Sequence, residues 1–232
     1  MQEPTTYFVI NSLEAGGAEA LNVSLAKVFK PNSIILLENK VEYDVTGVLS
    51  KIQSLSSFFS IPGALKYLLT WWYAYSLANY LKRKEGLSVI LLASLPRSLD
   101  VAIKTKRLLA KTHTIHVVAW EHANPDYGKR NNFLKQLTKS LYKQADAICV
   151  NSKNAAYYLQ NEYSIPPQKV DVVYNFFDAN QIQTLANKPL PAKDAHLFSA
   201  TSLIYFGRLR PQKGIEFLLE VFRIICEQQP TF

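Results

Sequence analysis

The chain has 232 residues, 48% of them hydrophobic and 19% charged, which excludes a disordered protein and indicates one complete domain with part of a second. The net charge of +8 calls for an anionic partner, namely membrane headgroups or a phosphate-rich substrate rather than nucleic acid, because no zinc-finger spacing or RNA-binding aromatic–glycine motif occurs. Two cysteines supply neither a disulfide framework nor a metal site, which fits a reducing compartment.

The first part of the chain alternates between strand and helix patterns. Short apolar runs predict strands at residues 6–11, 33–37, 89–93, 115–120, 147–150 and 170–174. Helical periodicity fills the gaps at residues 17–30, 62–84, 98–110, 130–144, 152–161 and 179–185. Because strands that alternate with helices build βαβ units, we expect an α/β domain with a Rossmann-like, doubly wound parallel sheet.

Two adjacent glycines, Gly16 and Gly17, follow the first predicted strand and begin the first predicted helix. Glycines at such a place let the backbone approach a ligand closely. Free N–H groups and the helix dipole favour an anion there. An ordinary tight turn between strand and helix explains the same pair of residues.

The predicted helix at residues 62–84 is the longest apolar and aromatic stretch. It contains Trp71 and Trp72 and ends in Lys82-Arg83-Lys84, a composition that suits a membrane interface better than a bilayer centre. A core helix with a basic tail is the alternative. The N-terminus lacks the basic start and apolar core of a secretory signal. We therefore expect a cytoplasmic protein, with the cytoplasmic face of the inner membrane as the surface that it would contact.

Polar residues follow two of the predicted strands, at the edge where α/β proteins bind ligands. Glu121 and His122 come after the strand at residues 115–120, and Asn175 comes after the strand at residues 170–174. An imidazole can exchange protons with a substrate or hydrogen-bond to it, and a neighbouring carboxylate can orient the ring. A loop histidine that bonds only to the backbone is the alternative.

Residues 188–198 contain two prolines and no apolar periodicity, so they predict a linker. Beyond it, an apolar run at residues 203–206 predicts a buried strand that ends in Gly207. Arg208 and Lys213 follow, with glycines on both sides, and two spaced cations at the end of a parallel strand can clamp a phosphate group. A solvated basic turn is the alternative.

This last segment, Gly207-Arg208-Leu209 with Lys213-Gly214 and a helix start at Ile215, resembles the opening of the second domain of GT-B glycosyltransferases of the family 4 type. The Gly16-Gly17 loop, the His122 loop and Asn175 are similar to first-domain elements of that family. The resemblance implies an acceptor-side domain at residues 1–187, a linker at 188–198 and the first strand and helix of a nucleotide-sugar-binding, Rossmann-like domain at 199–232.

The resemblance also implies an activity. A sugar would move from a nucleotide sugar, carried by UDP or GDP, to a glycan or lipid-linked acceptor, with retention at the anomeric carbon. The setting would be the synthesis of cell-surface polysaccharide, lipopolysaccharide or lipid-linked oligosaccharide. We expect no cofactor and no metal, because no D-x-D motif is present to hold a divalent ion.

Within that activity the resemblance implies three groups of site residues. The catalytic residues would be His122 and Glu121. The donor phosphates would be bound by Arg208, Lys213, Gly16 and Gly17, and the cleft would be lined by Asn175 and Gly207.

Two alternatives to this enzyme remain. The family carries a spaced glutamate pair deep in its second domain, and this chain ends at Phe232 before such an element, so we expect a truncated product. A non-catalytic remnant that binds only an acceptor or a membrane is the first alternative. The second is a dinucleotide-binding enzyme, because Glu38 closes the second strand where a ribose-binding acid would lie, although the third glycine of that motif is missing.

Overall fold

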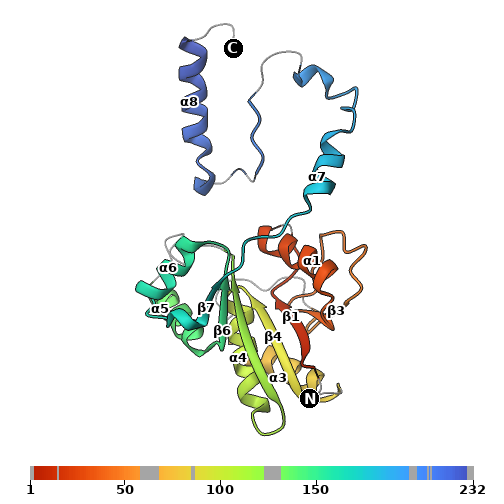
Figure 1. Ribbon diagram of the computed structural model, residues 1–232, viewed down its shortest axis with the longest axis vertical. Coiled ribbons are helices and arrows are strands. Elements are labelled where there is room, and N and C mark those ends of the chain that lie inside the picture. Colours follow the sequence, from red (N-terminus) through yellow and green to blue (C-terminus); the bar gives the residue numbers. More distant parts are fainter. Residues whose placement is uncertain are drawn as a thin grey trace. The chain divides into compact units, whose positions relative to one another are not determined.

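A parallel sheet organises the first part of the chain in the computed structural model (Figure 1). The structure describes residues 3–14, 16–57, 68–84, 87–122, 132–198, 203–207, 209 and 211–228. These residues form seven strands in the order β3-β2-β1-β4-β5-β6-β7. The strands are β1 (Thr5–Ile10), β2 (Ser33–Leu36), β3 (Lys51–Ser54), β4 (Ser88–Ser94), β5 (Thr114–Glu121), β6 (Ala147–Val150) and β7 (Val170–Val172).

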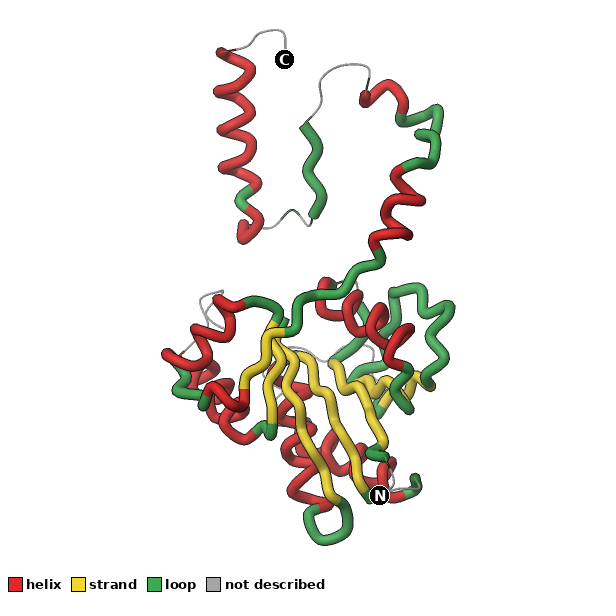
Figure 2. The backbone as a smooth tube through the Cα atoms, viewed as in Figure 1, coloured by secondary structure: helices red, strands yellow, loops and turns green. Residues whose placement is uncertain are grey.

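Helices connect the strands and pack against the sheet (Figure 2). In the first part of the chain they are α1 (Gly17–Phe29), α3 (Thr70–Lys82), α4 (Pro96–Leu109), α5 (Asn132–Gln144) and α6 (Lys153–Asn161), with a 3₁₀ turn at Pro167–Lys169. The predicted Rossmann-like α/β architecture is therefore confirmed.

The sheet buries apolar side chains on both faces, which explains why its inner strands read as continuous apolar runs. Along β1, Phe8 and Ile10 pack with α1 on one face, whereas Tyr7 and Val9 pack with α3 and α4 on the other. The strand order places β1 between β2 and β4. The chain runs outward from β1 in both directions, and this creates a topological switch point at the carboxyl ends of β1 and β4.

One strand, β3, was not predicted from the sequence. It pairs with β2, with Ser33 opposite Lys51, and forms the edge of the sheet. Its sequence, Lys-Ile-Gln-Ser, has a single apolar residue and is partly exposed. An edge strand needs little apolar surface because one side of it faces solvent, so periodicity alone does not detect it.

Helix α3 is described from Thr70 onward, and residues 62–67 of the predicted helix lie outside the described residues. The inward face of α3 carries Tyr73, Ala74, Leu77 and other buried side chains, so α3 is a core helix. Trp71 is nevertheless 51% exposed and Trp72 44% exposed. Within the described part of the chain, no helix has both the length and the apolar character required to cross a bilayer.

The chain forms two compact units, Met1–Phe177 and Asp178–Phe232. The second unit contains α7 (Ala179–Ala186), 3₁₀ turns at Ala195–Phe198 and Pro211–Lys213, and α8 (Ile215–Gln228). This division falls ten residues before the predicted domain end at Asn187, so α7 groups with the second unit. The predicted boundaries, including the linker at residues 188–198, stay a prediction.

The prediction of a buried strand at residues 203–206 was wrong. Leu203 and Ile204 are about half exposed and Phe206 is largely exposed, and the segment is not part of a sheet in the structure. A strand is stable only when neighbouring strands satisfy its backbone N–H and C=O groups. Among the described residues, no strand pairs with this segment.

Candidate functional site at the carboxyl edge of the sheet

The loop after β1 brings Gly16 and Gly17 to the switch point. Gly16 precedes α1, and its carbonyl oxygen accepts hydrogen bonds from the Tyr43 hydroxyl (2.7 Å) and from the Ala20 N–H (3.0 Å). The carboxylate of Glu19 lies where a side chain on Gly16 would extend. Gly17 differs, because a Cβ atom there would meet no other atom within 4 Å. A side chain on Gly16 would displace only the flexible end of Glu19, and nothing within 4 Å opposes one on Gly17, so packing within the protein requires neither glycine.

Two buried polar side chains join α1 to β4 beside this loop, and no sequence motif indicates this contact. The Asn22 amide donates to the Ser94 hydroxyl (2.9 Å) and to the backbone oxygen of Ala18 (2.9 Å). Both Asn22 and Ser94 are fully buried. A buried amide that lacked these partners would be costly, so the pair fixes where α1 begins relative to the sheet.

A buried ion pair lies at the ends of β1 and β2. The Arg97 guanidinium donates to the Glu38 carboxylate (2.5 Å) and to the Asn11 side-chain oxygen (3.2 Å). The side chains of Arg97 and Glu38 are only 6% and 4% exposed. Glu38 therefore faces Arg97 inside the protein, and this contact argues against the ribose-binding role that a dinucleotide-binding enzyme would give it.

Glu121 is the last residue of β5, and its side chain is buried. Its carboxylate accepts a hydrogen bond from the hydroxyl of Tyr142 on α5. This contact ties the end of the strand to the helix beneath it. The catalytic role predicted for Glu121 stays a prediction.

His122 follows directly, and its backbone oxygen accepts a hydrogen bond from the Asn151 amide (2.8 Å). The imidazole packs against Trp120, with the two ring centroids 4.4 Å apart. Neither ring nitrogen reaches solvent or has a hydrogen-bond partner among the described residues. Burial lowers the pKa of His122 to about 4. The ring is therefore neutral at pH 7 and carries one N–H donor and one nitrogen acceptor, both buried in this structure.

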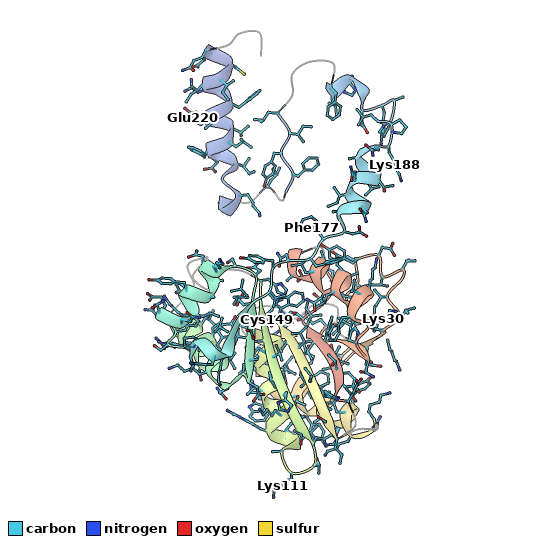
Figure 3. The ribbon with its side chains drawn as sticks, in the orientation of Figure 1. Lys30, Lys111, Cys149, Phe177, Lys188 and Glu220 are labelled. Carbon is cyan, nitrogen blue, oxygen red and sulfur yellow. The ribbon has the colours of Figure 1, made fainter. Side chains whose placement is uncertain are left out.

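Trp120 also lines an apolar pocket of about 110 Å³. Helix α1, strands β4 to β6 and the segment after β7 all contribute to its wall, through Leu21, Leu25, Leu92, Trp120, Cys149, Val173, Tyr174 and Phe176. Figure 3 labels Cys149 within this sheet. Asn175 lies in the same segment and is exposed. Gly17, His122 and Asn175 thus all follow carboxyl ends of strands in one sheet, as expected for a parallel fold.

The predicted phosphate clamp belongs to the second unit. Lys213 ends a 3₁₀ turn and is exposed, and Gly214 leads into α8 with a φ of +66°, a conformation that favours glycine. Gly207 is also exposed, and Arg208 lies outside the described residues. The assembly of Lys213 and Gly207 with Gly17 and His122 into one site stays a prediction.

A sequence model of Glycosyltransferase Family 4 matches residues 42–181. An uncharacterized glycosyltransferase of Methanocaldococcus jannaschii, MJ1059, is 24% identical over 139 residues, which are 58% of this chain and 34% of that protein. The N-acetylgalactosamine-N,N'-diacetylbacillosaminyl-diphospho-undecaprenol 4-alpha-N-acetylgalactosaminyltransferase of Campylobacter jejuni is 28% identical over 222 residues, which are 92% of this chain and 57% of that protein.

Solved structures share the fold. Anabaena HepE in complex with UDP and glucose superposes with a TM-score of 0.69 and 16% identity, covering 95% of this chain and 58% of HepE. The apo form of the lipopolysaccharide outer core galactosyltransferase WaaB gives a TM-score of 0.57 and 18% identity, covering 75% of this chain and 46% of WaaB. The chain thus spans between a third and three fifths of the length of the curated relatives it matches.

Proposed function

The chain belongs to glycosyltransferase family 4, and we propose that it supplies the acceptor-side domain and the start of the donor-side domain of an enzyme that transfers a sugar from a nucleotide sugar. The observation that carries this proposal is the family match over residues 42–181, which covers strands β3 to β7 and the His122 loop. The fold shared with HepE, whose structure holds UDP and glucose, supports a nucleotide-sugar donor.

The proposed acceptor is a glycan or a lipid-linked glycan. The name of the Campylobacter jejuni relative describes transfer to a saccharide carried on diphospho-undecaprenol, and WaaB is named for the lipopolysaccharide outer core. We extend this class of acceptor to the present chain, together with synthesis of cell-surface polysaccharide, lipopolysaccharide or lipid-linked oligosaccharide as its setting. The exposed Trp71 side chain on α3 supports contact with the cytoplasmic face of the inner membrane.

In the proposed reaction the bond between the sugar and the donor diphosphate breaks, and negative charge develops on the departing diphosphate. Arg208 and Lys213 would hold this charge in place of a metal ion, and they speed the reaction to the extent that they bind the leaving group better than the intact donor. Gly17 would let the α1 backbone approach the donor closely, and Gly16 would keep this loop in position.

His122 would act through hydrogen bonding. Its neutral ring cannot pair with phosphate as a cation. Once a substrate uncovers the buried ring nitrogens, the ring would accept a hydrogen bond from an acceptor hydroxyl or donate one to the transferred sugar. The contact of Glu121 with Tyr142 favours a role in fixing the strand end that carries His122. Asn175 and Gly207 would line the cleft. We propose retention at the anomeric carbon, as the family resemblance implies.

The test is a transfer assay of the chain, alone and together with a separately expressed second half, on a panel of UDP- and GDP-sugars with a lipid-linked acceptor. We expect transfer in the complemented form. Arg208→Ala and Lys213→Ala should each lower kcat/KM by about a hundredfold, because each removes a charge that stabilises the transition state. Lys188→Ala is the matched control, since it removes an exposed lysine of the same unit outside the clamp.

A non-catalytic module that binds an acceptor or a membrane is the second candidate, because the chain carries a net charge of +8 that favours an anionic partner. Anionic vesicles that bind the chain, combined with no turnover of any donor in the complemented form, would favour this module. Full activity in both clamp variants would instead remove the clamp from the mechanism while leaving glycosyl transfer in place.

A further inference from the structure

An open groove of about 690 Å³ lies beside the edge strand β3, at the carboxyl side of the sheet. Its wall comes from Asn39, three residues beyond the end of β2, from β3 with the residues after it, and from the start of α3. Four strand spacings separate β3 from β5, which carries Glu121, and this corresponds to roughly 19 Å. The groove is therefore distinct from the His122 site, although both open at the carboxyl edge of one sheet.

The lining of this groove is uncharged and only partly polar. The described residues that form it are two amides, three serines, two apolar residues and one indole, namely Asn39, Gln53, Ser54, Ser56, Ser57, Ile52, Leu55 and Trp72. The start of α3 contributes only the Trp72 side chain, and no cation lines the groove, so a phosphate ligand lacks the positive charge that would hold it. A lipid tail would require a continuous apolar wall. An uncharged sugar fits this set, because its hydroxyls pair with amides and hydroxyls while the apolar face of its ring packs on an aromatic side chain.

The polar groups retain capacity for a ligand. The Ser54 hydroxyl donates to Asn39 Oδ1 (3.0 Å), so the two N–H donors of the Asn39 amide are not used among the described residues. The Gln53 amide donates to the backbone oxygen of Ser54 (2.9 Å), which leaves Gln53 Oε1 as an acceptor. Ser57 is exposed at the end of the groove.

The backbone beneath these groups is held firmly. The Leu55 N–H donates to the Leu36 oxygen (2.8 Å), and the Ser56 hydroxyl donates to the Leu37 oxygen (2.8 Å). Both contacts join the end of β3 to β2. The donors and acceptors of the groove are therefore positioned before a ligand binds, which lowers the entropy lost on binding.

Two adjacent tryptophans of α3 differ in their surroundings. Trp72 lines the groove, and its ring meets the fully buried Tyr73 ring at 5.1 Å in an edge-on arrangement. Trp71 does not line the groove, and the Lys104 ammonium lies 5.1 Å from its ring centroid. Trp72 can thus present a fixed aromatic surface to a sugar ring, whereas Trp71 provides a matched comparison one residue away.

We propose that this groove binds an uncharged oligosaccharide, as a subsite for the part of a glycan acceptor that does not react. The proposal rests on the proposed glycosyl transfer, and it specifies the acceptor further. A chain of several sugar units is needed to reach from His122 to Trp72, so the acceptor is an oligosaccharide rather than a single sugar.

Isothermal titration calorimetry of this chain with linear tetramers of glucose, galactose and N-acetylglucosamine, and with the three monosaccharides, tests the groove without any activity. We expect at least one tetramer to bind about tenfold more tightly than its monosaccharide. Trp72→Ala should weaken that binding about tenfold, because it removes the stacking surface, while Trp71→Ala should change it less than about twofold. Circular dichroism tests whether both variants fold. If Trp72→Ala fails to fold, Asn39→Ala gives a second measure of the groove.

The outcomes separate this proposal from the proposed function. Absence of binding by every tetramer at about 20 mM, or equal losses in the two tryptophan variants, overturns the groove even if the complemented enzyme transfers sugar. Loss of vesicle binding in Trp72→Ala with no saccharide binding overturns it as well and assigns the surface to a membrane. Saccharide binding that depends on Trp72 supports the proposed saccharide site even if no donor is turned over. In that case only the proposed glycosyl transfer is contradicted.

Discussion

His122 brings an uncharged ring to a site proposed for anionic donors. Its position at a strand end was predicted from the sequence, because a polar residue after an apolar run marks the carboxyl edge of a parallel sheet. Its protonation state could not be predicted in the same way. Burial decides the low pKa, and burial depends on Trp120 and on the other groups around the ring.

The low pKa predicts how stability varies with pH. In the unfolded chain His122 takes up a proton as the pH falls below about 6.5, whereas the folded ring stays neutral until about pH 4. The free energy of unfolding is therefore unaffected by this group above pH 6.5. It falls as the pH drops from 6.5 to 4, by about 3 kcal/mol at most. Urea unfolding of the wild type and of His122→Phe between pH 7.5 and 4 measures it, and the difference between the two proteins should shrink or reverse at low pH. Parallel curves for the two proteins would contradict the prediction.

The partner of Glu38 could not be predicted from its position in the sequence. Its spacing from Gly16 and Gly17 fits a ribose-binding acid, yet in the folded chain its carboxylate pairs with Arg97, 59 residues away. Asn22 and Ser94 are separated by 72 residues and form a comparable contact. Such pairs are long-range, and no local pattern marks them.

At the scale of elements, most strands and helices were predicted to within a few residues, because buried apolar runs and helical periodicity are local signals. The two wrong predictions concern one strand segment with little apolar character and one that is wholly apolar. The partly polar β3 forms because β2 offers its edge, and the apolar segment at residues 203–206 forms no strand because the described residues offer it no partner. Strand pairing, rather than composition, decided both.

The start of α1 provides a prediction at this scale. Ala in place of Gly17 meets no atom of the protein and suits the first turn of a helix, so Gly17→Ala should leave the melting temperature unchanged or slightly raised. If the glycine exists to admit a ligand, the added methyl group should lower transfer by the complemented enzyme about tenfold or more. Thermal unfolding and the transfer assay are measured on the same preparation.

Gly47→Ala is the control for this variant. Gly47 has a φ of +82° and lies in an exposed loop, so alanine there should cost about 1 kcal/mol of stability without affecting transfer. Full activity in Gly17→Ala would show that the glycine pair serves only the turn.

At the scale of the whole molecule, the proposed clamp replaces a metal ion by two side-chain cations. Because Arg208 and Lys213 would supply the positive charge in this proposal, transfer by the complemented enzyme should persist, within about twofold, after dialysis against EDTA and in assays without added divalent ions. A loss that added Mg²⁺ or Mn²⁺ restores would contradict the clamp as the sole source of positive charge.

By itself, the sequence determined the Rossmann-like class, the family resemblance and the places of His122 and Asn175 after strand ends, because these depend on local periodicity and short motifs. Only the tertiary structure decided that Glu38 is paired and that His122 is neutral. It also decided that β3 forms an edge of the sheet and that Trp72 lines a groove while Trp71 does not. The physical reason is that burial and partners come from residues distant in sequence. Two neighbouring residues of one type can therefore have different surroundings that no local pattern distinguishes.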